Sequence, residues 1–485
     1  MPGVQPRKPW GLRWRSSVWY VTAIVGLGVM TDLLVYTIVI PVLPFQLERL
    51  GYSNVSGLVG WLLFAYSAGL VLSTPPIAMF SERYNTRTWP LVMGQVILIG
   101  SQIMLMLAPT YWLMVIARII QGISSSIIWV VGLALLCDTA SESIVGRQLG
   151  IAMTGLSLGM LVGPLAGGLL YHRFGFHGPG ILAIIATAAD LVGRLLIIER
   201  KDAIAHGVDP AADPRADEEA TVQEGPASDN DNKEEKPPAA EGTLAGLAPL
   251  PPPQTQQEQH APAAPATPRL SLLGVVRKLA TSKRALTVML GSTIYGMSYA
   301  SQEPALPLHL QAVWAFDSSK VGLIYLAGVL PTLVSSPLAG WLADTRGAEW
   351  TLSAALLLAL PWFGLLSVDG PLAFFIAMFC LENFFLAATV PPLTSELAAV
   401  ARQHDGIGYA HVYGAFNLSF GVGSALGPVI GGQMYDHIRR GWAAICYFSI
   451  GALFVTAVLT ACFLGDRPVL ARLRTLRTRR QAGVS

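Results

Sequence analysis

Twelve apolar runs of membrane-spanning length divide this chain into two sets of six. The first set lies at about residues 18–42, 57–79, 89–108, 111–137, 148–170 and 178–198. The second set lies at about residues 285–311, 319–342, 350–367, 371–397, 409–434 and 441–464. A helix needs roughly 20 apolar residues to cross a bilayer, so each run predicts one transmembrane helix. Because lipid offers the backbone no hydrogen-bond partner, the sequence predicts an all-α integral membrane protein.

The composition excludes most other classes of protein. Of the 485 residues, 53% are hydrophobic and only 13% are charged, whereas a soluble domain has roughly a quarter of its residues charged. The sequence has no Gly-rich phosphate loop, no Ser/His/Asp grouping and no metal-ligand spacing, so we expect no enzyme activity, no cofactor and no metal. Its basic residues form no nucleic-acid-binding motif. We expect a monomer in the lipid bilayer.

Lys and Arg side chains indicate the orientation. They are concentrated in both terminal segments and in the loops that share their side, which places the termini in the cytoplasm. We therefore expect a cytoplasmic arm (1–17), a six-helix half (18–198), a disordered cytoplasmic linker (199–269), an interfacial helix (270–284), a second six-helix half (285–464) and a basic cytoplasmic tail (465–485). The linker is rich in Pro, Ala, Glu and Gln, which bury little apolar surface. Asn54 begins a glycosylation sequon in the first outside loop.

The two halves are copies of each other. The segment Pro41-Val-Leu-Pro-Phe-Gln-Leu47 recurs 263 residues later as Pro304-Ala-Leu-Pro-Leu-His-Leu310. A glycine-rich segment that begins at Gly159 recurs 264 residues later from Gly423. Two long matches at almost the same offset indicate an internal repeat of six helices. Parallel repeats of this kind place a substrate site near the membrane midplane, between the halves.

Asp32 is a carboxylate inside the first apolar run. It lies about 21 Å along that helix, within a bilayer core about 30 Å thick. Carboxylates are rare at such a depth and usually face a cavity, a substrate path or a proton path. The alternative is that the helix starts elsewhere and Asp32 lies near an interface.

Four motifs together resemble the major facilitator superfamily, most nearly the vesicular amine transporters and related drug/proton antiporters. Helix 1 has an aspartate followed by Pro-x-x-Pro, in the stretch 32–44, and helix 4 has Ala-Arg-Ile-Ile-Gln-Gly at 117–122. Helix 5 has a glycine motif that ends in Gly-Pro at 163–164, and helix 7 has Glu-Pro-Ala-Leu-Pro at 303–307. The resemblance covers both helical halves and implies their fold.

The resemblance also implies roles for individual residues. Proton coupling and substrate binding are implied for Asp32, Tyr36, Arg118, Gln121 and Glu303. Close helix packing that permits rocking is implied for Gly155, Gly159, Gly163, Pro164 and Gly167, although static packing explains the same glycines. Gating is implied for Glu82, Arg83, Arg87, Asp344 and Arg346, with ordinary solvated loop charges as the alternative. For Arg118, the alternative is a side chain that extends to the outer interface.

Some positions depart from the amine-transporter pattern. Tyr66 stands where that family has a lysine in helix 2, and Asn417 stands where it has the partner aspartate in helix 11. The position of the acid in helix 10 is Ala387, with Glu382 about a turn and a half earlier. The absence of both the helix 2 lysine and the helix 11 aspartate makes physical sense, because either one alone would be a buried charge without a partner. Asp32 and Glu303 remain for proton coupling.

The resulting functional expectation is a secondary active transporter that exports a small organic compound, such as a drug, an amine or a secondary metabolite, in exchange for protons. Asp32, the deeper acid, is expected to contact substrate, and Glu303 to exchange protons near the outer end of helix 7. One alternative is a proton symporter or facilitator for organic acids or sugars. Another is a non-transporting receptor or scaffold on the same fold. The plasma membrane is favoured over vacuolar or vesicular membranes.

Overall fold

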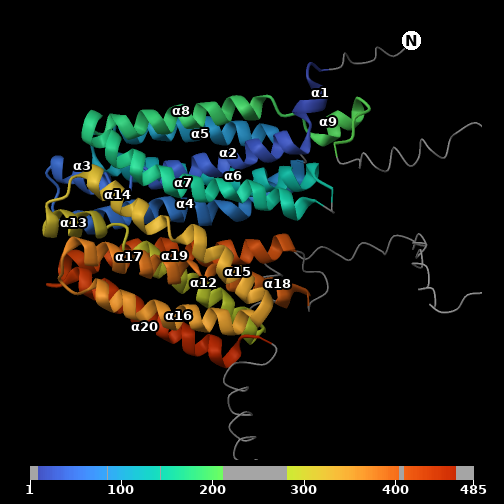
Figure 1. Cartoon of the computed structure of the whole chain (residues 1–485). Coiled ribbons are helices and arrows are strands. Elements are labelled where there is room, and N and C mark those ends of the chain that lie inside the picture. Colours follow the sequence, from blue (N-terminus) through green and yellow to red (C-terminus); the bar gives the residue numbers. More distant parts are fainter. Residues whose placement is uncertain (1–8, 85, 142–143, 211–280, 403–408, 466–485) are drawn as a thin grey trace, which may run out of the picture. The chain divides into compact units, whose positions relative to one another are not determined.

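The computed structural model describes residues 9–84, 86–141, 144–210, 281–402 and 409–465, in which every regular element is a helix (Figure 1). The first half contains α1 (Leu12–Arg15), α2 (Val18–Thr37), α3 (Leu43–Arg49), α4 (Val55–Tyr84), α5 (Thr88–Met106), α6 (Tyr111–Thr139), α7 (Val145–Phe174), α8 (His177–Leu195) and α9 (Arg200–Ala205). The second half contains α12 (Lys283–Ser301), α13 (Leu306–Trp314), α14 (Ser318–Val329), α15 (Thr332–Arg346), α16 (Ala348–Leu366), α17 (Leu372–Ala387), α18 (Val390–Arg402), α19 (Tyr409–His437) and α20 (Gly441–Phe463).

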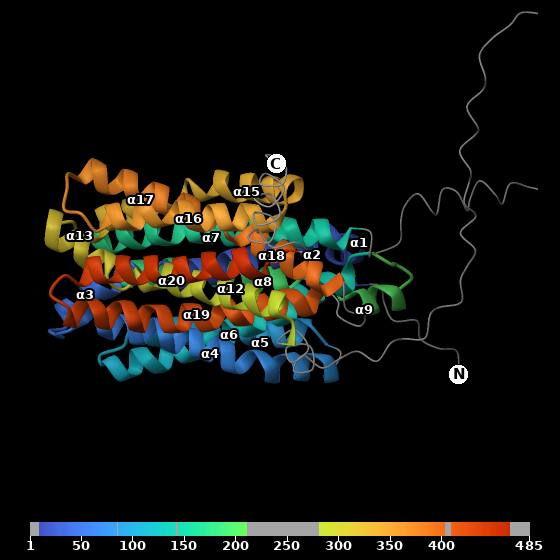
Figure 2. The same cartoon turned by 90° about the horizontal axis from the view of Figure 1, so that it is seen from below.

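These helices confirm the predicted fold class. Ten segments of the described chain have the length and hydropathy of a membrane span, and α12 and α19 fill the seventh and eleventh predicted runs. The chain is therefore an all-α membrane protein with two six-helix halves, and its long helices run side by side in both views (Figures 1 and 2). In the segment expected to be the linker, residues 200–205 form α9; the rest of the linker from 211 lies outside the described residues, as do most of the interfacial helix and the basic tail.

Two of the predicted helices are broken at equivalent places. The sequence predicts one continuous helix to residue 42, but α2 ends at Thr37 and α3 begins at Leu43. In the second half, residues 302–305 separate α12 from α13 in the same way. The prolines of the repeated Pro-x-x-Pro segment explain both breaks, because proline lacks the backbone donor that a continuous helix needs. The first break follows closely after Tyr36, and the second contains Glu303.

The glycine motif packs α7 against α2 of the same half. A Cβ atom on Gly155, Gly159, Gly163 or Gly167 would overlap backbone or side-chain atoms of α2 or of the residue that follows it. The same contact recurs in the second half, where Gly423, Gly427 and Gly431 of α19 meet α12. Only glycine lets two helices approach this closely, so the motif fixes how the first helix of each half is held.

A neighbouring glycine in each repeat makes the contact between the halves. Gly168 of α7 lies against the carbonyl oxygen of Ser318 at the start of α14, and Gly432 of α19 lies against the carbonyl oxygen of Ser56 in α4. Figure 1 shows α14 across α7, and Figure 2 shows α4 along α19. In each Gly-Gly pair, one glycine therefore contacts its own half and the next contacts the other half.

Polar contacts between the halves gather at the end opposite the N-terminal arm. The Gly57 N–H donates to Asp436 Oδ2 at 2.6 Å, and Gln311 Nε2 donates to Glu48 Oε2 at 3.1 Å. The Ser318 hydroxyl donates to the Gly168 carbonyl oxygen at 3.1 Å. The positive-inside rule assigns this end to the outside. The structure is thus a conformation in which the halves are joined at the end that is predicted to face outside.

The first half also contains a buried ion pair that the sequence reading did not single out. Arg194 Nε lies 2.9 Å from Asp190 Oδ2 on α8, and their side chains are 1% and 0% exposed. Gln95 of α5 donates a further hydrogen bond to the same carboxylate. The guanidinium lies against Gly28 of α2, where a Cβ atom would collide with it. This pair ties α8 to both neighbouring helices.

We predict that Gly168→Leu keeps the halves apart at their outer end. The new side chain would overlap the backbone of α14, and overpacking of this kind costs about 1–3 kcal/mol. The closed form should fall about tenfold, measured as the yield of a short bismaleimide cross-link between Glu48→Cys and Gln311→Cys. The control is Gly150→Leu on the same helix, since nothing lies within 4 Å of a Cβ atom there. Equal cross-linking in the two variants would contradict the prediction.

We predict that Arg194→Met destabilises the protein by about 3–5 kcal/mol, because the Asp190 carboxylate would remain buried without its cation. The measurement is the thermal unfolding temperature of the full-length protein in detergent. The double variant Asp190→Asn with Arg194→Met removes both charges and should recover much of the loss. If the double variant is no more stable than the single one, the pair is not the source of the effect.

Candidate functional site

Asp32 lies in a polar pocket formed by three helices of the first half. Its carboxylate is 1% exposed and accepts hydrogen bonds from Ser125 Oγ at 2.6 Å and from Trp129 Nε1 at 2.8 Å, both on α6. The hydroxyl of Tyr66 on α4 lies 3.4 Å from Asp32 Oδ2 and 2.9 Å from the Ser125 oxygen. Asp32 is therefore a fully enclosed acceptor, and the alternative of a position near an interface is wrong.

Arg118 is a second buried charge, on α6. Its side chain is fully buried, so the alternative in which it extends to the outer interface is also wrong. Its Nη1 donates to Gln121 Oε1 at 3.0 Å, and its guanidinium carbon lies 5.0 Å from the Tyr66 ring centroid and 5.5 Å from that of Tyr36. These distances allow cation–π attraction. Its Nε and Nη2 have no hydrogen-bond partner among the described residues.

Glu303 joins the two halves at the level of this cluster. The Tyr36 hydroxyl on α2 donates to Glu303 Oε2 at 2.8 Å, and Arg118 interacts with the same carboxylate electrostatically. The sequence places Glu303 near the outer end of its helix. In the structure it lies in the break between α12 and α13 and is 5% exposed, because α13 continues beyond it. Asp32, Tyr36, Arg118, Gln121 and Glu303 thus meet in one region, and their shared role in transport stays a prediction.

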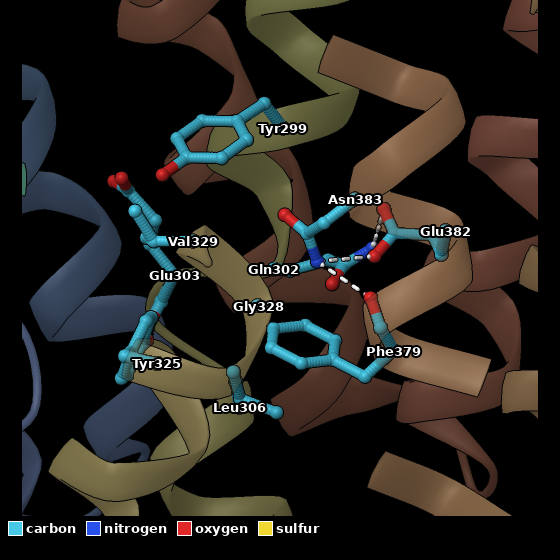
Figure 3. Close-up of a pocket in the computed structure, with 10 residues that line it drawn as sticks. All are labelled: Tyr299, Gln302, Glu303, Leu306, Tyr325, Gly328, Val329, Phe379, Glu382 and Asn383. Carbon is cyan, nitrogen blue, oxygen red and sulfur yellow. Dashed lines mark hydrogen bonds between the residues drawn. The ribbon is translucent and has the colours of Figure 1, made fainter. Parts of the chain in front are cut away.

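A pocket in the second half begins at Glu303 and extends to a carboxylate that was not among the predicted site residues (Figure 3). Its lining comes from α12, α14, α17 and the break before α13, and consists of Tyr299, Gln302, Glu303, Leu306, Tyr325, Gly328, Val329, Phe379, Glu382 and Asn383. Glu382 and Asn383 were not among the predicted site residues, and they add a carboxylate and an amide to the pocket. The available signal was an acid that is the only charged residue of the segment that forms α17.

The predicted gating residues are only partly brought together. Arg87 forms an ion pair with Asp138 at the end of α6, at 2.9 Å, and also bonds the Ser81 carbonyl oxygen. Glu199 accepts the backbone N–H groups of Arg87 and Thr88 and thereby caps α5. Sequence reasoning missed both Asp138 and Glu199.

Three further residues with a predicted role are exposed to solvent or lipid. The side chains of Asp344 and Arg346 are exposed at the end of α15. Asn54 is exposed in the turn before α4, and its glycosylation stays a prediction. The side chains of Glu82, Arg83 and Asn417 lie outside the described residues.

Relatives of the whole chain are transporters. A fungal "MFS-type transporter ppzB" of Metarhizium rileyi is 26% identical over 95% of this chain and 97% of its own length. The "Chromaffin granule amine transporter" of Rattus norvegicus is 24% identical over 86% of this chain and 67% of its own length.

Solved structures share the fold. A bacterial homologue of the human lysosomal transporter Spinster, described as inward-facing, superposes with a TM-score of 0.62, 14% identity and 96% coverage of both chains. The nucleoside transporter NupG superposes with a TM-score of 0.64 and 12% identity, over 91% of this chain and 98% of its own.

The family itself follows from a sequence profile of the Major Facilitator Superfamily, which matches residues 25–279 and 288–484. This match covers both halves, including the helices that hold Asp32, Arg118 and Glu303. The chain belongs to the Major Facilitator Superfamily and is a multi-pass membrane transporter.

Proposed function

We propose that this transporter exports a small organic compound in exchange for protons. The observation that carries the proposal is the hydrogen bond from Tyr36 to Glu303, because it joins the halves through an ionisable group. A carboxylate accepts a stronger hydrogen bond when it is ionised than when it is protonated. Proton binding at Glu303 therefore weakens the contact between the halves and shifts the population toward an outer-open form.

Arg118 extends this coupling to the first half. It interacts electrostatically with Glu303, and its guanidinium lies over the rings of Tyr36 and Tyr66. Tyr66 is also one of the residues that contact Asp32. Two of its buried donors have no partner among the described residues. Buried donors of this kind require water or a ligand acceptor. These two donors support a site in which one cation, Arg118, interacts with bound substrate, with Asp32 and with the proton-binding residue Glu303.

The chemistry around Asp32 favours an organic substrate with a basic or aromatic part. Asp32 supplies negative charge, while Trp129 and the rings of Tyr36 and Tyr66, 4.8 Å apart between centroids, supply flat apolar surface. Drugs, amines and secondary metabolites include compounds of this kind. We place the transporter in the plasma membrane, where efflux removes the compound from the cell. An untargeted comparison of metabolites inside and outside cells, with and without the protein, identifies the substrate.

We predict that Asp32→Asn removes substrate binding and transport together. The amide keeps the shape of the side chain but loses the negative charge, and it places a donor group against the Ser125 and Trp129 donors. Affinity for the substrate identified above should fall at least about tenfold, or about 1.4 kcal/mol, in a binding assay on purified protein. The control is Asp369→Asn, an exposed acid between α16 and α17, which should bind normally. Unchanged binding by Asp32→Asn would place the substrate elsewhere.

We predict that Glu303→Gln separates exchange from uphill transport. Glutamine retains an acceptor for the Tyr36 hydroxyl, so the outer end still closes, but it cannot carry a proton. Proteoliposomes containing this variant should exchange labelled for unlabelled substrate at close to the normal rate. Concentrative uptake driven by a pH difference should fall to the level of empty liposomes. If Glu303→Gln still concentrates substrate in response to a pH difference, Glu303 has a structural role only.

A further inference from the structure

We propose that the pocket in the second half is a separate binding site for a single positive charge, with Glu382 as its charged group. The occupant is either a proton or the cationic group of an organic ammonium compound. This inference rests on the proposed proton-coupled function and extends it, because it assigns a second exchangeable cation to a carboxylate other than Asp32 and Glu303.

Glu382 has only neutral partners. The side chain lies on α17 and is 1% exposed. Asn383 Nδ2 donates to its Oε2 at 2.8 Å, and Gln302 Nε2 donates to its Oε1 at 3.3 Å. Among the residues that the structure describes, no Lys or Arg forms an ion pair with it. The two amides hold the carboxylate in place without neutralising it.

Three other buried carboxylates, Asp32, Asp190 and Glu303, each interact with an arginine. Asp190 forms an ion pair with Arg194, which also interacts electrostatically with Asp32. Glu303 has Arg118 in the same role. An uncompensated charge in a low-dielectric interior costs several kcal/mol. Glu382 therefore requires a positive charge that the described chain does not supply.

The pocket around Glu382 has a free volume of about 30 Å³, which is room for a water-sized occupant in this conformation, and walls that suit a positive charge. Figure 3 shows Glu303 and Glu382 on opposite sides of it, with the ring of Phe379 and the amide of Gln302 between them. The titratable groups that face Glu382 are Tyr295 and Tyr299 from α12 and Cys446 from α20, and Tyr325 of α14 completes the lining. All of these are neutral when protonated, so Glu303 is the other charged group. Aromatic faces and two carboxylates together attract a cation.

The internal repeat supports the same assignment. Glu382 lies 264 residues after Arg118, the offset that relates Gly159 to Gly423. The fourth helix of the first half therefore carries a buried cation where the corresponding helix of the second half carries a buried carboxylate. The first half contains its own positive charge at this place, whereas the second half must bind one.

The test is an infrared titration of the full-length protein reconstituted in lipid. The carbonyl band of protonated carboxyl groups is followed over a pH series in the natural protein, in Glu382→Gln and in the control Asp369→Asn. We expect one titrating band to be absent from Glu382→Gln and retained in Asp369→Asn. Glu382→Asp should keep the band with a displaced midpoint, which guards against a glutamine variant that fails to fold.

A second arm distinguishes the two occupants, with tetraphenylphosphonium as the organic cation. If an organic cation shares the pocket, this probe should displace the proton and move the band's midpoint by about one pH unit for a tenfold excess over its dissociation constant. If the midpoint does not move, the occupant is the proton alone. Identical titrations of the natural protein and folded Glu382→Gln would overturn the proposal. Because no transport is measured, a failure of proton-coupled export would be seen separately.

Discussion

An ionised group inside a bilayer must have a partner, and this requirement determines how the site is arranged. In the first half, Arg194 pairs with Asp190 and also interacts electrostatically with Asp32, whereas the second buried arginine, Arg118, interacts with Glu303 of the second half. The space for Arg194 depends on Gly28, since any Cβ atom there would collide with the guanidinium. Charge and packing are therefore coupled in this half: the close approach of α2 to α8 is possible only with a small residue at this contact.

Glycine also determines how the halves meet. Gly168 and Gly432 bring the backbone of one half against the backbone of the other, and such contacts contain few side chains that could bind tightly. The halves are therefore joined by surfaces that can separate without breaking a large interlocked core. The hydrogen bond of Tyr36 to Glu303 adds a buried ionisable contact between the halves, beyond the contacts that Glu48 and Asp436 make at their end of the interface.

The sequence predicted the helical fold, the repeat and the buried charges Asp32, Arg118 and Glu303, because spanning length, proline and buried charge are visible in a single chain. It did not predict Ser125 and Trp129, which donate hydrogen bonds to Asp32. It did not predict Glu382 as a site residue, nor the pair of Asp190 with Arg194. Lipid-facing and core-facing side chains are both apolar in these helices, so the periodicity that reveals the buried face of a soluble helix is weak here. The partner of Arg87, Asp138, lies on another helix and could only be found from the fold.

The halves differ in buried charge, and in the proposed transport cycle this difference would make their separation depend on a cation. Within the described second half, Glu303 and Glu382 are buried deep between helices, and the arginine nearest to Glu303 belongs to the first half. While the outer end is closed, Arg118 and Tyr36 compensate Glu303. When the halves separate, Glu303 loses both, and the second half would then hold two uncompensated carboxylates at a cost of several kcal/mol each. Under the proposed proton-coupled function, separation would therefore be favourable only if protons or a cationic substrate neutralised these groups, and cation binding would be a condition of the movement.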